Sequence, residues 1–136
     1  MLRRVRYLSP EWFDAARQAL AADPGLPAAT AGIRVTLQQT VTDAPHAPDT
    51  GGEIRWRLVI DDGGVRLEPG PGPADIRFTT SYATAARIAA GELGAPTAFI
   101  RGDLRVGGDL TLLTTHHRPL AAVHDVLAEV RKDTVF

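Results

Sequence analysis

The sequence contains no cysteine among its 136 residues. This absence excludes disulfide bonds, thiolate nucleophiles and cysteine-ligated zinc sites. Long apolar stretches are also missing, because every uninterrupted apolar run is far shorter than the ~20 residues of a membrane-spanning helix. The basic start of the chain lacks the apolar run of a signal peptide. We therefore expect a cytoplasmic protein.

A strong excess of charge is absent too. Lysine and arginine number 15 against 16 acidic residues, and the formal net charge of −1 gives no reason to expect a nucleic-acid partner. The hydrophobic content of 44% and the charged content of 23% are typical of a globular protein. The arginine-rich basic residues and abundant alanine, glycine and proline favour a GC-rich, bacterial source. The length predicts a single domain over 1–136.

The first helix is predicted over 9–22. Ser9 can cap it, Pro10 fits its first turn and Glu11 suits the positive end of its dipole. Apolar residues then recur at helical spacing. They are Trp12, Phe13, Ala16 and Leu20.

Strands are predicted where apolar and polar residues alternate. One covers 33–41, with its apolar face formed by Ile33, Val35, Leu37 and Val41 and its polar face by Arg34, Thr36, Gln38 and Thr40. Residues 42–52 are rich in proline, aspartate and glycine and predict a long hairpin loop. The further strands expected cover 53–60, 65–67, 76–78 and 104–106.

Helical spacing returns in the second half of the chain. Ser81 can cap a helix over 82–90 that Gly91 closes, and Pro96 begins a short helix that Gly102 ends. Further helices are expected over 109–116 and from Pro119 onward. The fold class is thus α+β, with an N-terminal helix (9–22), a sheet with central helices (32–108) and C-terminal helices (109–132).

One part of the sequence resembles the sterol carrier protein 2 (SCP2-like) family. The resemblance is carried by Asp75-Ile-Arg-Phe-Thr-Thr80, the helix ending in Ile88-Ala-Ala-Gly91, the run Ala98-Phe-x-x-Gly-x-Leu-x-Val-x-Gly108 and the segment Trp56–Gly63. It implies a five-stranded sheet of order 3-2-1-4-5, helices covering one face, and an apolar tunnel that binds sterols, fatty acids, acyl-CoA or phospholipids. The end at Phe136 carries no peroxisomal targeting tripeptide.

The predicted ligand site is the apolar sheet face under the helices. Ala85, Ala86 and Ala89 stand where leucine would normally fill a core, so the helix either packs closely or leaves a cavity. The resemblance favours the cavity. The ligand-binding residues expected are Leu37, Gln39, Trp56, Leu58, Phe78, Tyr82, Ala85, Ala89, Phe99, Leu104, Val106 and Leu112.

Two details of this site leave alternatives. Gln39 either meets a polar ligand group or marks where its strand emerges into solvent, and we favour the second. Trp56 should border the tunnel, whereas Trp12 is expected to pack away from it.

Five arginines share the opposite face of the predicted sheet. They either contact an anionic membrane transiently or form a solvated face with Glu53, Glu68 and Asp75, and we favour the solvated face. They are Arg34, Arg55, Arg57, Arg66 and Arg77.

No motif indicates catalysis, a metal or a cofactor. The spacings of His116, His117 and His124 do not fit a zinc site, and no Gly-x-Ser-x-Gly elbow is present. We therefore expect non-catalytic binding and transfer of an apolar, lipid-like small molecule. The alternative is that the domain is an interaction or dimerisation module that forms a homodimer. In that case its cavity has collapsed. An enzyme with an unrecognised site is the third and weakest hypothesis.

Overall fold

The computed structural model describes residues 4–47 and 51–136, and part of the predicted loop over 42–52 lies outside these residues. The helical elements are α1 (Pro10–Ala22), α2 (Leu26–Ala29), α3 (Tyr82–Ala89), α4 (Ala95–Ile100), α5 (Thr111–Thr115), α6 (His117–Val130) and the short 3-10 turn η2 (Arg131–Asp133). The strands are β1 (Val5–Arg6), β2 (Arg34–Thr42), β3 (Ile54–Asp61), β4 (Gly64–Pro69), β5 (Ile76–Ser81), β6 (Leu104–Gly108) and β7 (Thr134–Val135).

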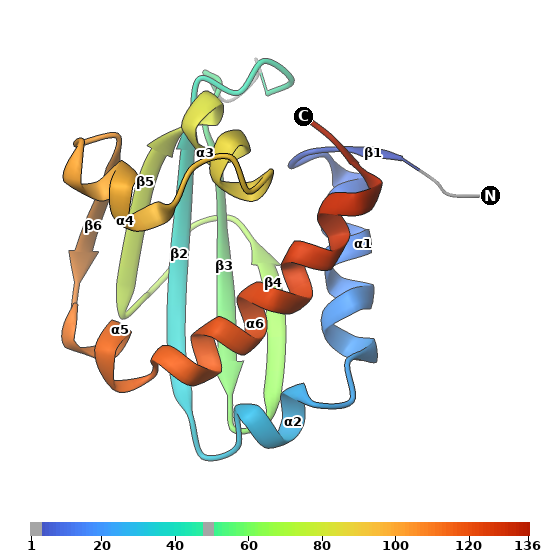
Figure 1. The fold of residues 1–136 in the computed structure, drawn as a ribbon, viewed down its shortest axis with the longest axis vertical. Coiled ribbons are helices and arrows are strands. Elements are labelled where there is room, and N and C mark those ends of the chain that lie inside the picture. The colour runs from blue at the N-terminus through green and yellow to red at the C-terminus, as the bar shows by residue number, and fades with distance from the viewer. Residues whose placement is uncertain (1–3, 48–50) are drawn as a thin grey trace.

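Five strands form one sheet in the order β4-β3-β2-β5-β6, which confirms the expected order. The central pair β2 and β5 is parallel, and the other three pairs are antiparallel. Helices lie over one face of this sheet (Figure 1). The α+β class and the one-sided cover are thus confirmed.

The buried core lies between the sheet and its helices. The pairing places Leu37 of β2 between Leu58 of β3 and Ile76 of β5, and all three are buried. Val35 of β2 and its partner Ile60 of β3 are also buried and lie on the same face of the sheet. The alternating pattern of β2 and β3 therefore sets both the register and the face that is covered.

The predicted helix caps are confirmed. The Trp12 amide donates to the Ser9 hydroxyl oxygen at 3.2 Å, and the Thr84 amide donates to that of Ser81 at 3.2 Å. Gly91 follows α3 with φ of +79°, a conformation that glycine adopts more easily than other residues do.

Three short elements were not expected from the sequence. α2 follows α1, and β1 pairs in parallel with β7, so the two ends of the described chain lie side by side. α1 packs against α6, and α2 packs against α6 and β4. The last helix begins at His117 and not at the predicted Pro119, because proline is tolerated in a first turn whose amides need no helical partner.

One position on the polar sheet face differs from the expected solvated face. Gln38 is only 9% exposed because the segment 70–73 passes over it. The Gly72 amide donates to the Gln38 side-chain oxygen at 3.2 Å.

Neighbouring glycines at the end of β6 offer a stability test. Gly108 has φ of +91°, and a Cβ there would collide with the Asp75 carbonyl oxygen, whereas a Cβ at Gly107 would meet open space. We expect Gly108→Ala to lower the free energy of unfolding by about 2 kcal/mol or more. Gly107→Ala is the matched control and should have little effect. Urea unfolding followed by circular dichroism measures both, and equal stabilities would contradict the strain assigned to Gly108.

Candidate functional site

A cavity of about 640 Å³ lies between the covered face of the sheet and the helices. The sheet supplies its floor from β2, β3, β5 and β6. Its other walls come from α1, α3, α5 and α6, from the segment 91–96, and from Tyr7 and Arg131. The lining is predominantly apolar, as in many binding sites for small molecules.

Eight of the twelve residues predicted to bind ligand line this one cavity. They are Leu37, Gln39, Trp56, Leu58, Phe78, Ala85, Ala89 and Leu104. Ala85 and Ala89 belong to α3, and their short side chains face the space that leucine would have filled. The pattern of alternating strands with an alanine-rich helix therefore gathers residues around a hollow.

The other four predicted residues lie outside the cavity lining. Phe99 is 50% exposed, because α4 buries Ala98 instead. Tyr82 packs against the rings of Tyr7 and His46, and its hydroxyl donates to the Tyr7 carbonyl oxygen at 3.4 Å.

Val106 and Leu112 pack against the core without lining the cavity. Val106 lies on the edge strand beside Phe78. In α5 the residue at the cavity is Leu113, one position after the predicted Leu112.

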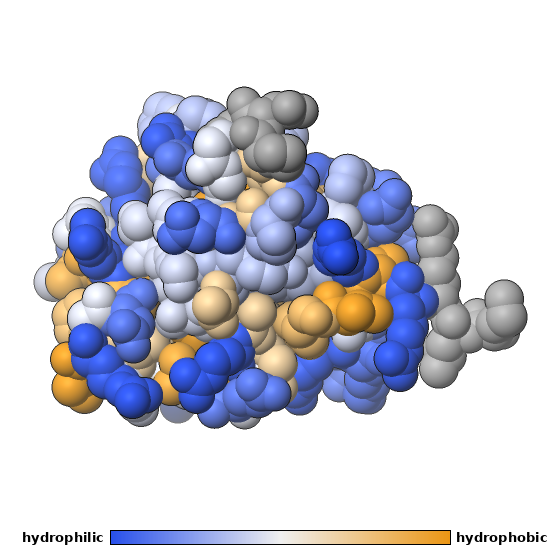
Figure 2. All heavy atoms as spheres, turned by 90° about the horizontal axis from the view of Figure 1, so that it is seen from above, coloured by the Kyte–Doolittle hydropathy of each residue, from blue (hydrophilic) through white to orange (hydrophobic). Residues whose placement is uncertain are grey.

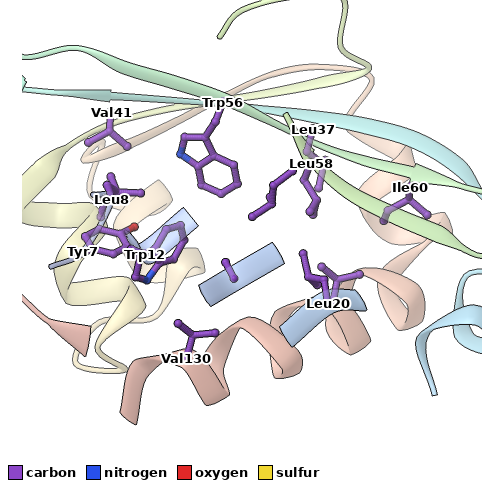
Figure 3. Packing of buried hydrophobic residues seen from close by; sticks show 14 of the residues in the cluster. Tyr7, Leu8, Trp12, Leu20, Leu37, Val41, Trp56, Leu58, Ile60 and Val130 are labelled. Atoms are coloured by element: carbon purple, nitrogen blue, oxygen red, sulfur yellow. The ribbon is translucent and has the colours of Figure 1, made fainter. Parts of the chain in front are cut away.

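Trp12 lies beside the cavity, which corrects the expectation that it packs elsewhere. Its ring centroid is 6.2 Å from that of Trp56, and both side chains line the cavity. Figure 3 shows Trp56 extending from the sheet toward Trp12 on the helical side. The apolar spacing of α1 identified Trp12 as buried but could not identify what it packs against.

The polar groups of the cavity floor are neutral. Gln39 is half-buried between Trp56 and Phe78 of the neighbouring strands, so it lines the cavity instead of emerging into solvent. The Trp56 indole N–H is buried, and no acceptor among the described residues lies within hydrogen-bond distance. Burial raises the pKa of the Tyr7 phenol, which therefore stays protonated.

Basic side chains appear only on the α6 side of the cavity. His124 and Arg131 both line it, and no aspartate or glutamate does. Arg131 was not among the residues predicted from the sequence, although the spacing of α6 contains a signal for it. Leu120, His124, Leu127 and Arg131 follow one another at spacings of four, three and four, which places them on one helical face.

A second hollow, of about 750 Å³, lies between the start of α1 and the ends of β3 and β4. Four charged residues line it: Asp14, Arg17, Glu53 and Arg55. This charged groove suits an apolar ligand less well than the cavity does.

Four of the five arginines on the opposite sheet face form ion pairs with acidic side chains. Arg57 pairs with Glu68 at 2.8 Å, and Arg34 pairs with Asp61 at 3.3 Å. Asp75, expected to join this network, instead accepts from the Thr36 amide at 2.8 Å. These pairs favour a solvated face over one kept free for an anionic surface.

Within residues 4–47 and 51–136, no group of three or more histidine or acidic side chains could hold a metal ion. None of the helices in these ranges has the length and hydropathy needed to cross a membrane.

Comparisons with known proteins agree with this geometry. A sequence model described as "SCP-2 sterol transfer family" matches residues 14–120. Among curated proteins, none matches the chain.

Several solved structures share the fold. A crystal structure of sterol carrier protein 2 is 20% identical with a TM-score of 0.70, and the match covers 91% of this chain and 98% of that one. Palmitated SCP2L2 from Aedes aegypti is 18% identical with a TM-score of 0.54, covering 88% and 95%. A double mutant of the sec-alkyl sulfatase PisA1 is 26% identical with a TM-score of 0.57, covering 81% of this chain but 16% of the enzyme.

The alanines of α3 allow a test of the cavity. Ala89→Leu should place a larger side chain in the hollow and weaken binding of a neutral apolar dye such as Nile red at least fivefold. This corresponds to a loss of about 1 kcal/mol of binding free energy, which is comparable to the burial of one or two methylene groups. Ala83 is exposed on the same helix and does not line the cavity, so Ala83→Leu is the control. Dye fluorescence titration measures both variants. Equal loss in both, or none in either, would show that the dye binds elsewhere.

Proposed function

Because this chain belongs to the SCP-2 sterol transfer family, we propose that it binds and carries an apolar, lipid-like ligand without catalysing a reaction. The observation that supports this most is the apolar cavity of about 640 Å³ under the helices. A hollow of this size falls within the range of pockets that hold small organic ligands. The proposal includes residues 1–136 acting as one domain, with eight cavity residues as the ligand site.

Binding energies support a ligand with a long hydrocarbon part. Burying an acyl chain contributes about 0.8 kcal/mol per methylene group, so a 16-carbon chain gains roughly 12 kcal/mol. Association costs about 4–15 kcal/mol in lost freedom. Useful affinity is therefore attainable through the tail alone. The palmitated mosquito protein of the same fold supports fatty acids as first candidates.

A second hypothesis is an interaction or dimerisation module. It is favoured by exposed apolar side chains, which interrupt the charged surface at one end of the molecule (Figure 2). The exposed large hydrophobic residues of the described chain include Phe99, Ile100, Val135 and Phe136. Native mass spectrometry of freshly purified protein separates the two hypotheses. A bound lipid mass supports the carrier, whereas a dimer without lipid supports the module.

Tryptophan emission offers a direct test of the carrier. Since Trp12 and Trp56 both line the cavity, a fatty acid should change the emission of each. Trp12→Phe and Trp56→Phe should each keep part of the signal, and affinity should change only modestly because phenylalanine is also apolar and aromatic. If fatty acids, acyl-CoA and sterols all leave the emission unchanged and calorimetry records no heat, the carrier function is wrong.

The arginine face leads to a prediction about membranes. Because four of its five arginines are paired with carboxylates, the protein should sediment equally with neutral and anionic vesicles at ~0.05 M salt. Vesicle sedimentation at ~0.05 and ~0.3 M salt measures this. A preference for anionic vesicles that falls as salt rises would instead support membrane contact through Arg34, Arg55, Arg57, Arg66 and Arg77.

A further inference from the structure

Arg131 is the one side chain with a permanent charge among the described residues that line the cavity. It directly follows α6, on the same helical face as Leu120, His124 and Leu127. The side chain is exposed, so it lies at the rim of the cavity and remains in contact with water. A cation at the edge of an apolar hollow is the arrangement that an anionic amphiphile requires.

The position of the guanidinium depends on a glycine across the cavity rim. Gly91 ends α3 with φ of +79°, and a Cβ built there would collide with Nη1 of Arg131. The guanidinium therefore lies directly against the backbone at Gly91. This contact joins the end of α6 to the segment after α3, and both form the rim.

No carboxylate in the part of the chain that the structure describes forms an ion pair with this guanidinium. The acidic residues closest along the chain are Glu129 of α6 and Asp133 of η2, each two positions away. Glu129 accepts a hydrogen bond from Lys132 at 2.6 Å. This hydrogen bond and the charge of Lys132 lower the pKa of Glu129 most, and the charge of Arg131 lowers it less, so the carboxylate is charged and hydrogen-bonded to Lys132. Arg131 thus has the donors of its planar fork available to a ligand.

We propose that the ligand is an anionic amphiphile whose tail fills the cavity and whose carboxylate or phosphate head binds Arg131 at the rim. This inference rests on the proposed carrier function and narrows its ligand class. It predicts that neutral sterols bind more weakly than anionic amphiphiles. It also predicts that an alcohol binds more weakly than an acid of the same tail length.

The alternative orientation places the head at the cavity floor. The polar side chains found there among the described residues, Gln39, Thr80 and the Trp56 indole, are neutral donors or acceptors. An ion buried among them would lose its hydration without gaining an opposite charge, which costs far more than burying a hydroxyl. At the rim a head group keeps part of its hydration and gains charge-assisted hydrogen bonds from an arginine.

The experiment compares two ligands with the same tail and different heads. Tryptophan emission is titrated with dodecanoate and with dodecanol below their aggregation concentrations. The wild-type protein should bind dodecanoate more tightly. Arg131→Gln should weaken dodecanoate roughly tenfold, the size expected for one charge-assisted hydrogen bond, and should leave dodecanol within about twofold.

Arg118→Gln is the matched control, because it removes one positive charge from an exposed residue of α6 that does not line the cavity. It should leave both affinities unchanged. Arg131→Lys should restore part of the preference for dodecanoate, since the charge returns without the planar fork.

Several results would overturn the inference while leaving the carrier function intact. They are equal affinity of the wild-type protein for acid and alcohol, an Arg131→Gln effect equal on both, or loss of dodecanoate binding in Gln39→Leu but not in Arg131→Gln. If neither ligand binds the wild-type protein, the inference fails, and the carrier function fails with it only if acyl-CoA and sterols do not bind either. A parallel titration with dodecyl phosphate identifies the head, because the preferred anion should show the larger Arg131 dependence.

Discussion

One face of the five-stranded sheet carries large apolar side chains, and this face has to be separated from water for the chain to fold. The cover comes from distant parts of the sequence, because α1 and α6 lie near opposite ends of the chain and pack against each other. The parallel pairing of β1 with β7 joins the segments that flank these two helices. Burial of the sheet therefore depends on long-range contacts, and local sequence preferences alone cannot complete it.

The cavity follows from the uneven size of the covering side chains. Trp12 of α1 contacts Trp56, and Val123 of α6 is fully buried, so parts of the cover are tightly filled. α3 contributes Ala85 and Ala89, whose side chains are too short to fill the space above the sheet as the larger side chains of α1 and α6 do. The parallel pairing of β5 with β2 places the start of α3 beside the sheet centre, since α3 follows β5 directly. The hollow is thus a consequence of topology and of small residues at one helix.

Features set by neighbouring residues could be predicted from the sequence. The cap at Ser81, the glycine end at Gly91 and the faces of β2 follow from local chemistry and from a period of two. Contacts between segments that are distant in the sequence could not be predicted. The stripe of α1 predicts that Trp12 is buried but not beside Trp56, and the polarity of Gln38 predicts a solvated position that the segment 70–73 in fact covers.

Tail and head make different contributions to ligand choice in such a cavity. Each methylene contributes about the same free energy in any apolar environment, so the floor and walls select for chain length and little else. Discrimination among lipids of equal tail length must come from polar groups, because a polar site left unpaired is costly. Among the described residues that line this cavity, the only group with a permanent charge is Arg131, and it is exposed at the rim. In the proposed carrier, affinity is therefore set in the interior of the protein, and selectivity is set at its rim.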